Sequence, residues 1–587
     1  MAVHNPLAGV ARGAARWSAT HPWQAIGAWV AFVAFAVGLA VAVPTVEAEG
    51  SDYWEWESGE ASAMIDEARL DDADSEVVLI AGDDMSQAPA AAAAITDGMQ
   101  GLKGVAGTSD PLWNDDRSAM LLSIQLARDQ DDVELLQAVT EQVAVEHPDL
   151  SIEQAGERSV DAAIDERVGD DLSSAEATSV PVTLILMLIA FGALIAAGVP
   201  VLLAVGGVAA TIGISAPLSH LVHAETTVIS MIVLIGMAVG VDYSLFYLKR
   251  EREERARGRS TLDAVEIAAE TSGHSIIVSG FAVIASMTGL FVAGGATQNS
   301  LAVCSILVVA IAVLGSLTVL PAVLVKLGRW VDRPRVPGLW RLNNRIGKGG
   351  ISRRILAPVV RRPVAALILT GLVVGALTLP ALGMKLHTGS LETLPASIDE
   401  VQTMQTLSDE FPGEGPVVDV VGSGDPDEVR RGLSALRQDA LERDDFAAVG
   451  GQDLKVSDDG RTAVLTLGVP FEEASEKVDH AVEELRDDLI PAHLDGRSID
   501  HAVGGDAARA YDAGTHMNHR LPLVIGFILA LTMVMMGFAF RSGPIAVVSA
   551  ALNLLSVGVA FGLMTLVFQH GWGDQLLDFT TPGFLID

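Results

Sequence analysis

Asp242 and Tyr243 place an acid beside a phenol inside an apolar stretch of this 587-residue chain. The stretch, 226–248, has the length of a membrane-spanning helix, and the carboxyl group then lies roughly 10 Å from the end at Lys249. A charged Asp in a bilayer costs about 2.5–3.5 kcal/mol unless it faces other helices, is paired or is protonated. Tyr243 supplies a hydroxyl group that can donate to the carboxylate. The pair predicts a proton-relay site, and a helix-pairing Asp close to the interface is the alternative.

Two glycines in the same stretch bear on how this helix packs. Gly236 and Gly240 are four residues apart, so they share one face of a helix. Small residues at this spacing let a neighbouring helix approach closely within a membrane. We therefore expect another span to pack tightly against this face.

The remainder of the chain supplies many more apolar segments. Half of its residues are hydrophobic and 19% are charged, so the net charge of −36 must be concentrated between the apolar segments. A helix needs roughly 20 apolar residues to cross the hydrocarbon core. Nine segments qualify, namely 23–43, 178–197, 199–219, 226–248, 274–294, 300–327, 363–383, 521–540 and 544–568.

The distribution of charge indicates the orientation of these spans, because Lys and Arg are enriched in cytoplasmic segments. With the N-terminus inside, the inside segments hold 20 of the 38 Lys and Arg residues, at more than three times the density of the two large outside segments. Those outside segments, 44–177 and 384–520, hold 62 of the 74 Asp and Glu residues. We therefore expect a cytoplasmic N-terminus and two acidic extracytoplasmic domains.

The chain contains an internal repeat. A basic residue followed by proline, at 21–22 and again at 362–363, precedes a span, a polar domain of about 135 residues and closely spaced spans. Residues 191–193 correspond to 540–542 at a cytoplasmic turn. Two parallel copies related by an axis along the membrane normal are a known transporter plan. The second copy has only three spans before Asp587, so we expect a C-terminally truncated chain.

Each polar domain mixes strand-like and helix-like stretches. Residues 77–80 and 417–421 are predicted as buried strands, and 133–146 and 474–489 as amphipathic helices. This mixture indicates α+β domains, so the predicted fold is a polytopic α-helical membrane protein with two parallel repeats and two extracytoplasmic α+β domains. The predicted segments are a cytoplasmic N-terminus (1–22), a span (23–43), an outside domain (44–177), a five-span bundle (178–327), a basic cytoplasmic linker (328–362), a span (363–383), a second outside domain (384–520) and the final two spans with the chain end (521–587).

Several classes of activity lack their motifs here. The chain contains no phosphate-binding loop of the Gly-x4-Gly-Lys-Ser/Thr type, so ATP is not expected as its energy source. No His, Cys and Asp cluster has metal-ligand spacing, and the single cysteine, Cys304, cannot form an intrachain disulfide. We expect no enzyme, no cofactor and no metal. The basic stretch 326–362 fits anionic lipid at the inner surface better than nucleic acid.

Two other positions have ordinary interpretations. Glu225 is an acid at the start of a helix, where acidic residues are favoured. Tyr53, next to Trp54, belongs either to an interfacial aromatic belt or to a path for a hydrophobic substrate.

The sequence Gly-Val-Asp-Tyr-Ser-Leu-Phe at 240–246, followed by a basic and acidic run at 249–257 and by Gly258, resembles the signature of the MmpL (mycobacterial membrane protein large) family of the RND superfamily. The resemblance covers essentially the whole chain. Further similar segments are 273–280, 317–322 and 553–558.

This resemblance implies twelve spans, two porter-like domains, and proton-motive-force-driven export of lipids or other hydrophobic molecules across the bacterial cytoplasmic membrane. It implies that Asp242 and Tyr243 face a second Asp-Tyr pair beyond Asp587, and that Ser279 and Ser286 are polar positions near the relay. The implied partners are membrane lipids, a hydrophobic substrate and protons, while homo-oligomers and accessory membrane proteins stay open. A non-transporting lipid-sensing scaffold, or an inactive partial copy, is the alternative.

Overall fold

The computed structural model describes residues 6–586 apart from a set of internal gaps. The gaps are 49, 55, 71–74, 83, 115, 128–132, 226, 336–356, 388–397, 412–415, 450–453, 472–474, 574–580 and 582. Residues 336–356 of the predicted basic linker therefore lie outside the described residues.

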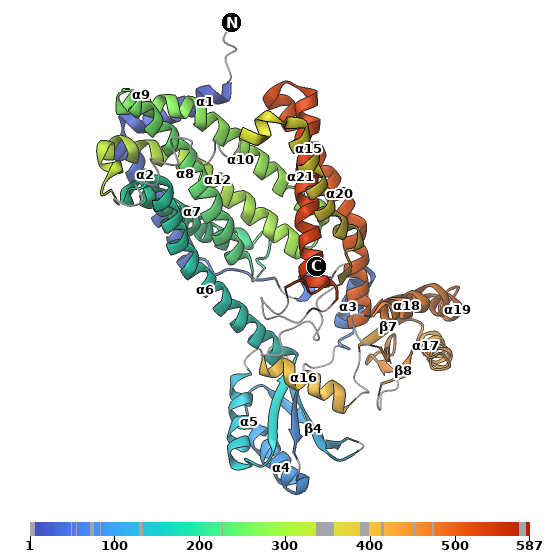
Figure 1. The fold of residues 1–587 in the computed structure, drawn as a ribbon. Helices are drawn as coiled ribbons and strands as arrows, with labels where there is room; N and C mark the ends of the chain where they lie inside the picture. The colour runs from blue at the N-terminus through green and yellow to red at the C-terminus, as the bar shows by residue number, and fades with distance from the viewer. Residues whose placement is uncertain are drawn as a thin grey trace. The chain divides into compact units, whose positions relative to one another are not determined.

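The chain forms two compact units, each built from separate stretches of sequence (Figure 1). The first unit, which holds the apolar helices, comprises Met1–Tyr53, Leu172–Met384 and Met517–Gly573. The second unit, which holds two five-stranded sheets and the short parallel pair of β6 (Leu386–His387) and β12 (Leu585–Ile586), comprises Trp54–Asp171, Lys385–His516 and Asp574–Asp587.

Within the described residues, eight helices of the first unit are long and apolar enough to cross a membrane. The ninth predicted span corresponds to the shorter apolar stretch Thr178–Phe191 at the end of α6 (Glu157–Phe191), so the predicted count of nine is not established. The eight are α2 (Pro22–Ala42), α7 (Leu194–Ser219), α8 (Val228–Ala256), the series α9 (Thr261–Ala268), η3 (Ala269–Gly273), α10 (His274–Met287) and α11 (Leu290–Ala293), α12 (Ala296–Leu327) with η4 (Gly328–Asp332), α15 (Pro363–Thr378) with η5 (Leu379–Gly383), α20 (Asp506–Phe540), and α21 (Gly543–Met564) with η8 (Thr565–Gln569).

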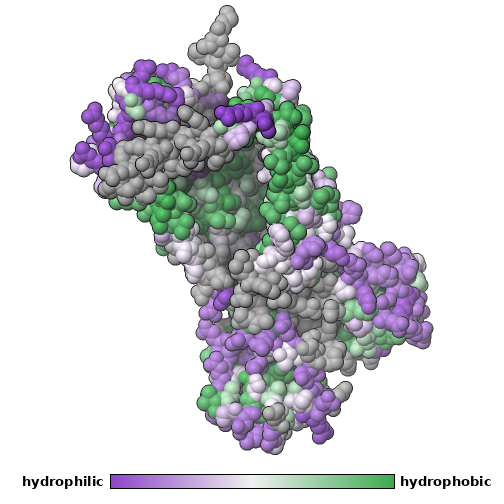
Figure 2. Space-filling model, viewed as in Figure 1, coloured by the Kyte–Doolittle hydropathy of each residue, from purple (hydrophilic) through white to green (hydrophobic). Residues whose placement is uncertain are grey.

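The surface of these helices is apolar where other helices do not cover it. In Figure 2, hydrophobic residues dominate the visible faces of α15 and α21, whereas hydrophilic residues dominate the part of the second unit around α17 (Pro426–Ala440) and α18 (Glu476–Glu484). Leu367 and Leu372 of α15 are 74% and 67% exposed. A soluble protein rarely exposes so continuous an apolar surface, so lipid is its natural environment.

One predicted boundary between spans is wrong. The sequence placed the break between the second and third spans at 197–199, but α6 ends at Phe191 and α7 begins at Leu194. Gly192 adopts a φ of 65°, which a helix cannot accommodate and which glycine tolerates without strain. Hydropathy could not locate this break because the residues on both sides of it are apolar.

The two copies of the repeat show the same local geometry at this turn. α6 and α20 are each 35 residues long, and each ends in a phenylalanine. The next residue is left-handed in both copies, with φ of 65° at Gly192 and 49° at Arg541. α7 and α21 then begin within three residues. The predicted correspondence of 191–193 with 540–542 therefore holds at the level of the backbone.

The N-terminal segment contains a helix that the sequence interpretation did not include. Helix α1 (Pro6–Thr20) places Ala11, Ala15 and Ala19 in the same buried cluster as residues of α8 and α12. Two arginines of α1 also form ion pairs with neighbouring helices. Arg12 lies 3.4 Å from Glu270 of η3, and Arg16 lies 3.5 Å from Glu266 of α9. The described residues of α1 are therefore part of the helical bundle.

The second unit contains two antiparallel sheets of the same topology. The first has the order β2-β4-β1-β5, with β3 paired to β4, and the second has the order β8-β10-β7-β11, with β9 paired to β10. Together with two helices each, both follow the split β-α-β plan of ferredoxin-like domains. The bounds are β1 (Ser75–Ala81), η2 (Met85–Gln87), α4 (Ala88–Met99), β2 (Val105–Thr108), β3 (Leu112–Trp113), β4 (Ala119–Leu126), α5 (Glu134–Glu146) and β5 (Ser151–Gly156), then β7 (Val417–Gly424), α17, β8 (Ala447–Ala448), β9 (Lys455–Val456), β10 (Thr462–Gly468), α18, η7 (Leu485–Leu489), α19 (Ile490–His493) and β11 (Ile499–Gly504).

One helix is exchanged in each direction between these two domains. α16 (Asp399–Glu410) belongs to the second domain by sequence, but Leu407 and the following Phe411 pack against Leu79 and Leu121 of the first sheet. α3 (Trp56–Glu67) belongs to the first domain by sequence, but its Ala61 packs against the second sheet. Successive strand residues point to opposite faces, so each sheet carries its own helices on one face and the exchanged helix on the other.

An ion-pair network fixes the exchanged helix α3. Arg486 of η7 lies 2.9 Å from Glu57 of α3 and 2.5 Å from Asp512 of α20. The carboxylate of Asp512 also accepts a hydrogen bond from the backbone N–H of Ser58 at 3.0 Å. Arg486 and Asp512 are mostly buried, with side chains 15% and 8% exposed, so this pair is shielded from solvent.

Candidate functional site

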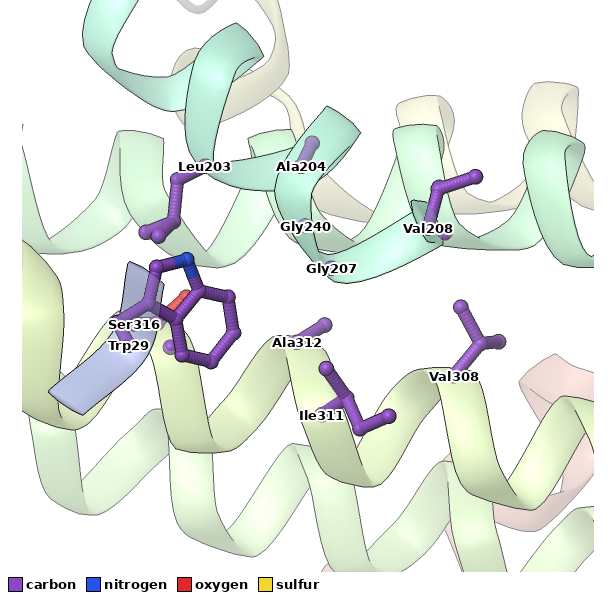
Figure 3. A pocket seen from close by; sticks show the side chains of 12 residues that line it. Trp29, Leu203, Ala204, Gly207, Val208, Gly240, Val308, Ile311, Ala312 and Ser316 are labelled. Atoms are coloured by element: carbon purple, nitrogen blue, oxygen red, sulfur yellow. The ribbon is translucent and has the colours of Figure 1, made fainter. Parts of the chain in front are cut away.

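Helix α8, which carries Asp242 and Tyr243, packs closely on its glycine face. A Cβ atom at Gly236 would lie 2.6 Å from a methyl carbon of Val208 in α7 and 2.7 Å from one of Val308 in α12. A Cβ atom at Gly240 would lie 3.0 Å from the Cβ of Ala204 (Figure 3). Any side chain at Gly236 would displace a neighbouring helix, so the two glycines set the distance between α8 and the helices beside it.

A small cavity of about 10 Å³ remains among α2, α7, α8 and α12 beside Gly240 (Figure 3). Ser316, which lines it, is fully buried, and its hydroxyl group has no hydrogen-bond partner within the described residues. A cavity of this size holds about one water molecule. This part of the bundle therefore has room for a water but none for a lipid.

The carboxyl group of Asp242 lies away from this glycine face. Two residues along a helix correspond to a rotation of about 200°, so Asp242 and Gly240 occupy opposite sides of α8. Asp242 is exposed, and it forms no hydrogen bond or ion pair within the described part of the chain. Phe246, one turn further along the same side, is 53% exposed. The acid therefore lies on a face of α8 that no described residue covers.

Tyr243, by contrast, is buried in the bundle and faces α10. Its ring is 5% exposed and belongs to the cluster that contains Ile276 and Leu320. A Cβ atom at Gly280 would lie 3.8 Å from the Tyr243 hydroxyl oxygen, and the side chain of Ser279 interacts with that hydroxyl group. The phenol is thus held between α8 and α10.

The two serines that the resemblance implied are placed differently. Ser279 lies beside Tyr243 and also donates to the backbone carbonyl oxygen of Ile276 in its own helix, at 3.2 Å. Ser286 is seven residues further along α10, which is about 10 Å. The structure therefore brings Ser279, but not Ser286, to the phenol.

The end of α8 that begins at Val228 is tied to the segment preceding the second unit. The hydroxyl group of Tyr53, in η1 (Gly50–Tyr53), donates to the Glu225 carboxylate at 2.5 Å, and Thr297 donates to the same carboxylate at 3.3 Å. Burial, and then the bond to Glu225, raise the pKa of Tyr53, so it stays protonated as the donor. The backbone N–H of Ala48 donates to Ala224 at 2.9 Å. We call these contacts the Tyr53 strap.

Removing the hydroxyl group in a Tyr53→Phe variant is expected to loosen the strap locally. Loss of a hydrogen bond at a partly exposed site costs about 1 kcal/mol, which corresponds to roughly fivefold faster opening. We expect hydrogen exchange at the amides of Ala48 and Ala224 to accelerate by about that factor. Tyr511→Phe removes a comparable bond, to Glu483 at 2.9 Å, and should leave exchange in the strap unchanged. Equal exchange in both variants and the parent would show that the strap does not depend on Tyr53.

The opposite end of α8 is fixed by ion pairs. Arg252 and Arg255 lie 3.0 and 3.2 Å from the carboxylate oxygens of Asp332 in η4. Arg255 also lies 2.7 Å from Glu251, and Arg252 donates to the carbonyl oxygen of Phe191 at 3.3 Å. α8 is therefore fastened at both ends, so Asp242 and Tyr243 occupy the middle of an anchored helix.

Sequence reasoning missed these anchoring residues. It interpreted Glu225 as a helix-start acid and the 249–257 run as a mark of orientation and part of the family signature, not as partners that anchor α8. Asp332 could have been found, because it is the single acid in the basic stretch 326–362. Tyr53 could not, since 172 residues separate it from Glu225 and nothing local connects them.

Eight described helices that are long and apolar enough to cross a bilayer are the architecture of a multi-pass membrane protein. The family model described as "MMPL family" matches residues 58–366 and 391–585. The chain therefore belongs to the MMPL family of RND-type transporters, and the resemblance noted from its motifs is confirmed.

Named relatives include exporters of mycobacterial lipids. The chain is 31% identical over 445 residues to the mycolic acid-containing lipids exporter MmpL11 of Mycolicibacterium smegmatis, covering 73% of this chain and 46% of that protein. It is 26% identical over 521 residues to the trehalose monomycolate exporter MmpL3 of the same organism, covering 81% and 50%. A Mycobacterium tuberculosis relative, 29% identical over 445 residues (73% and 45%), is named heme uptake protein MmpL11. The chain spans about half the length of these relatives.

Proposed function

We propose that this chain takes part in the export of lipids or other hydrophobic molecules across the bacterial cytoplasmic membrane, driven by the proton motive force. The exporter names of two relatives support the substrate class. The observation that carries the proton coupling is Asp242, an acid on the open face of an apolar helix that is packed tightly on its other side.

In this proposal Asp242 and Tyr243 form half of the proton relay. Protonation neutralises the carboxylate and removes the cost of keeping a charge within the membrane, so the protonated and charged forms favour different surroundings. Ser279 keeps the phenol of Tyr243 in place beside the acid. In the proposal, a second Asp-Tyr pair, which the resemblance to the family implies, completes the relay.

In this proposal, the relay causes a movement that is transmitted along α8. Because α8 is anchored at its Val228 end, a shift of the helix would move Glu225 and, through the strap, Tyr53. Tyr53 is followed directly by the segment that continues into α3, so the movement reaches a covalent connection to the second unit. This proposal has the N-terminus in the cytoplasm and both α+β domains outside it.

The energy source can be tested in cells that carry the complete gene. Newly made lipids are pulse-labelled, and the labelled fraction at the cell surface is measured with a protonophore or with an ATP synthase inhibitor that leaves the proton gradient intact. We expect the protonophore to stop gene-dependent export within minutes and the inhibitor to leave it largely unchanged. Export that continues in a collapsed gradient would rule out proton coupling, and the lipid-sensing scaffold would then be favoured.

A further inference from the structure

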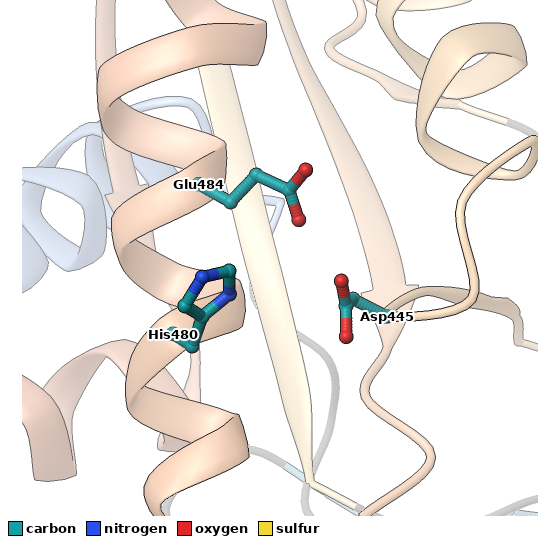
Figure 4. A group of neighbouring side chains, drawn as sticks. All are labelled: Asp445, His480 and Glu484. Atoms are coloured by element: carbon teal, nitrogen blue, oxygen red, sulfur yellow. The ribbon is translucent and has the colours of Figure 1, made fainter.

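A group of three potential metal ligands lies in the second α+β domain (Figure 4). His480 and Glu484 are four residues apart on α18, so they lie on one face of that helix. Asp445 comes from the segment between α17 and β8, and its carboxylate faces the same space. One nitrogen or oxygen atom of each residue lies within 4.8 Å of those of the other two.

The ligand atoms of this group have little other bonding. One carboxylate oxygen of Glu484 pairs with Arg443, while the second, Oε2, is buried without a hydrogen-bond partner in the described part of the chain. The side chains of Asp445 and His480 form no hydrogen bond or ion pair with any described residue. A buried acceptor without a partner is unfavourable, because it has lost its hydrogen bonds to water. A cation between the three side chains would satisfy it.

The local charge also favours a cation. Arg443 pairs with Glu484 and lies 3.8 Å from Asp439. Asp445 adds a third carboxylate, so one guanidinium group lies among three acids. The region stays negatively charged even though Arg443 neutralises one of the carboxylates, and this charge attracts a divalent cation.

We propose that Asp445, His480 and Glu484 bind one divalent transition-metal ion of the Zn²⁺ type, joining α18 to the segment that follows α17. The imidazole nitrogen selects against Mg²⁺ and Ca²⁺, which prefer oxygen ligands. Three protein ligands at about 2.0–2.2 Å leave a fourth position for water. These bond lengths require the three side chains to close by about 1 Å, which the exposed ring of His480 permits. The sequence analysis could not identify these residues as a metal-ligand set, because Asp445 lies 35 positions before His480.

The test is a titration of the full chain, purified without a histidine tag and stripped with EDTA, with ZnCl₂ by isothermal calorimetry. We expect one site per chain. His480→Ala and Asp445→Asn should each weaken Zn²⁺ binding at least about tenfold, since even indirect changes around metal ligands have effects of that size. The matched control is His493→Ala, whose imidazole pairs with Asp439 at 2.9 Å and lies outside the group.

Each other outcome decides against the site. Unchanged Zn²⁺ affinity in His480→Ala, or an equal loss in His493→Ala, overturns the assignment. Ca²⁺ bound as tightly as Zn²⁺ would show an ordinary acidic surface instead. Circular dichroism checks the folding of each variant, and a rise in the unfolding temperature with Zn²⁺ that is absent only in the group variants gives a second, independent reading.

Discussion

Replacing Asp242 with Asn is expected to abolish proton-driven export while leaving the protein folded and inserted. An amide has nearly the volume of the carboxyl group, but it cannot take up or release a proton at physiological pH. Asp242 forms no bond within the described residues, so its replacement breaks no internal contact. Transport should fall to the level of cells that lack the gene.

This variant is measured as surface-exposed labelled lipid, in cells whose complete chromosomal copy carries the substitution. Asp427→Asn makes the same chemical change near the start of α17, in the second unit, and should export at the normal rate. Membrane abundance of both variants is compared by immunoblot. Normal export by Asp242→Asn at normal abundance would remove Asp242 from the relay.

Replacing Arg486 with Ala is expected to cause the largest loss of stability in the second unit. The change leaves Asp512, whose side chain is 8% exposed, without its charge partner, and it also removes the contact of α3 through Glu57. Removing one partner of a buried ion pair typically lowers the free energy of unfolding by about 3–5 kcal/mol. We expect α3 to detach from the second sheet and become accessible to protease.

Limited proteolysis with detection of cleavage within Trp56–Glu67 measures this detachment. A double variant, Arg486→Met with Asp512→Leu, replaces both charges by apolar groups and should recover much of the protection, since no buried charge is left unpaired. Arg497→Ala serves as the control for loss of an arginine in the same domain. Protection in Arg486→Ala equal to that of the parent would mean that the network does not hold α3.

The fold was predictable wherever a short pattern determines it. Apolar length gave the positions of α2 and α12 to within four residues, because crossing a membrane requires such length, whereas α8 continues eight residues past the predicted end of its span at Leu248. The strands at 77–80 and 417–421 are present as β1 and β7. Helix α1 was missed, because it is stabilised by packing against distant helices rather than by its own pattern. Hydropathy did not locate the break at Gly192, which lies within continuous apolar sequence, but the internal repeat placed a turn at 191–193.

The candidate site was predictable only in part. Asp242 stands out because an acid is costly in apolar sequence, and the spacing of Gly236 and Gly240 indicated a close helix contact of the kind that Val208 and Val308 make. The anchoring of α8 depends on pairs such as Tyr53 with Glu225 that are far apart in the chain. A single sequence, without an alignment to other sequences, contains no signal for such pairs.

The exchange of α3 and α16 sets an order for making this protein. The face of the first sheet that contains Leu79 and Leu121 stays uncovered until Leu407 and Phe411 have been synthesised. About 290 residues separate Leu121 from Phe411, which at translation rates of 5–20 residues per second is a delay of about 15–60 s. During that time the helices from α6 to α15 are synthesised while this apolar face stays uncovered. The nascent chain therefore needs protection from aggregation, and if synthesis stalls before residue 411, the first sheet keeps an uncovered face and β7 of the second sheet is not made.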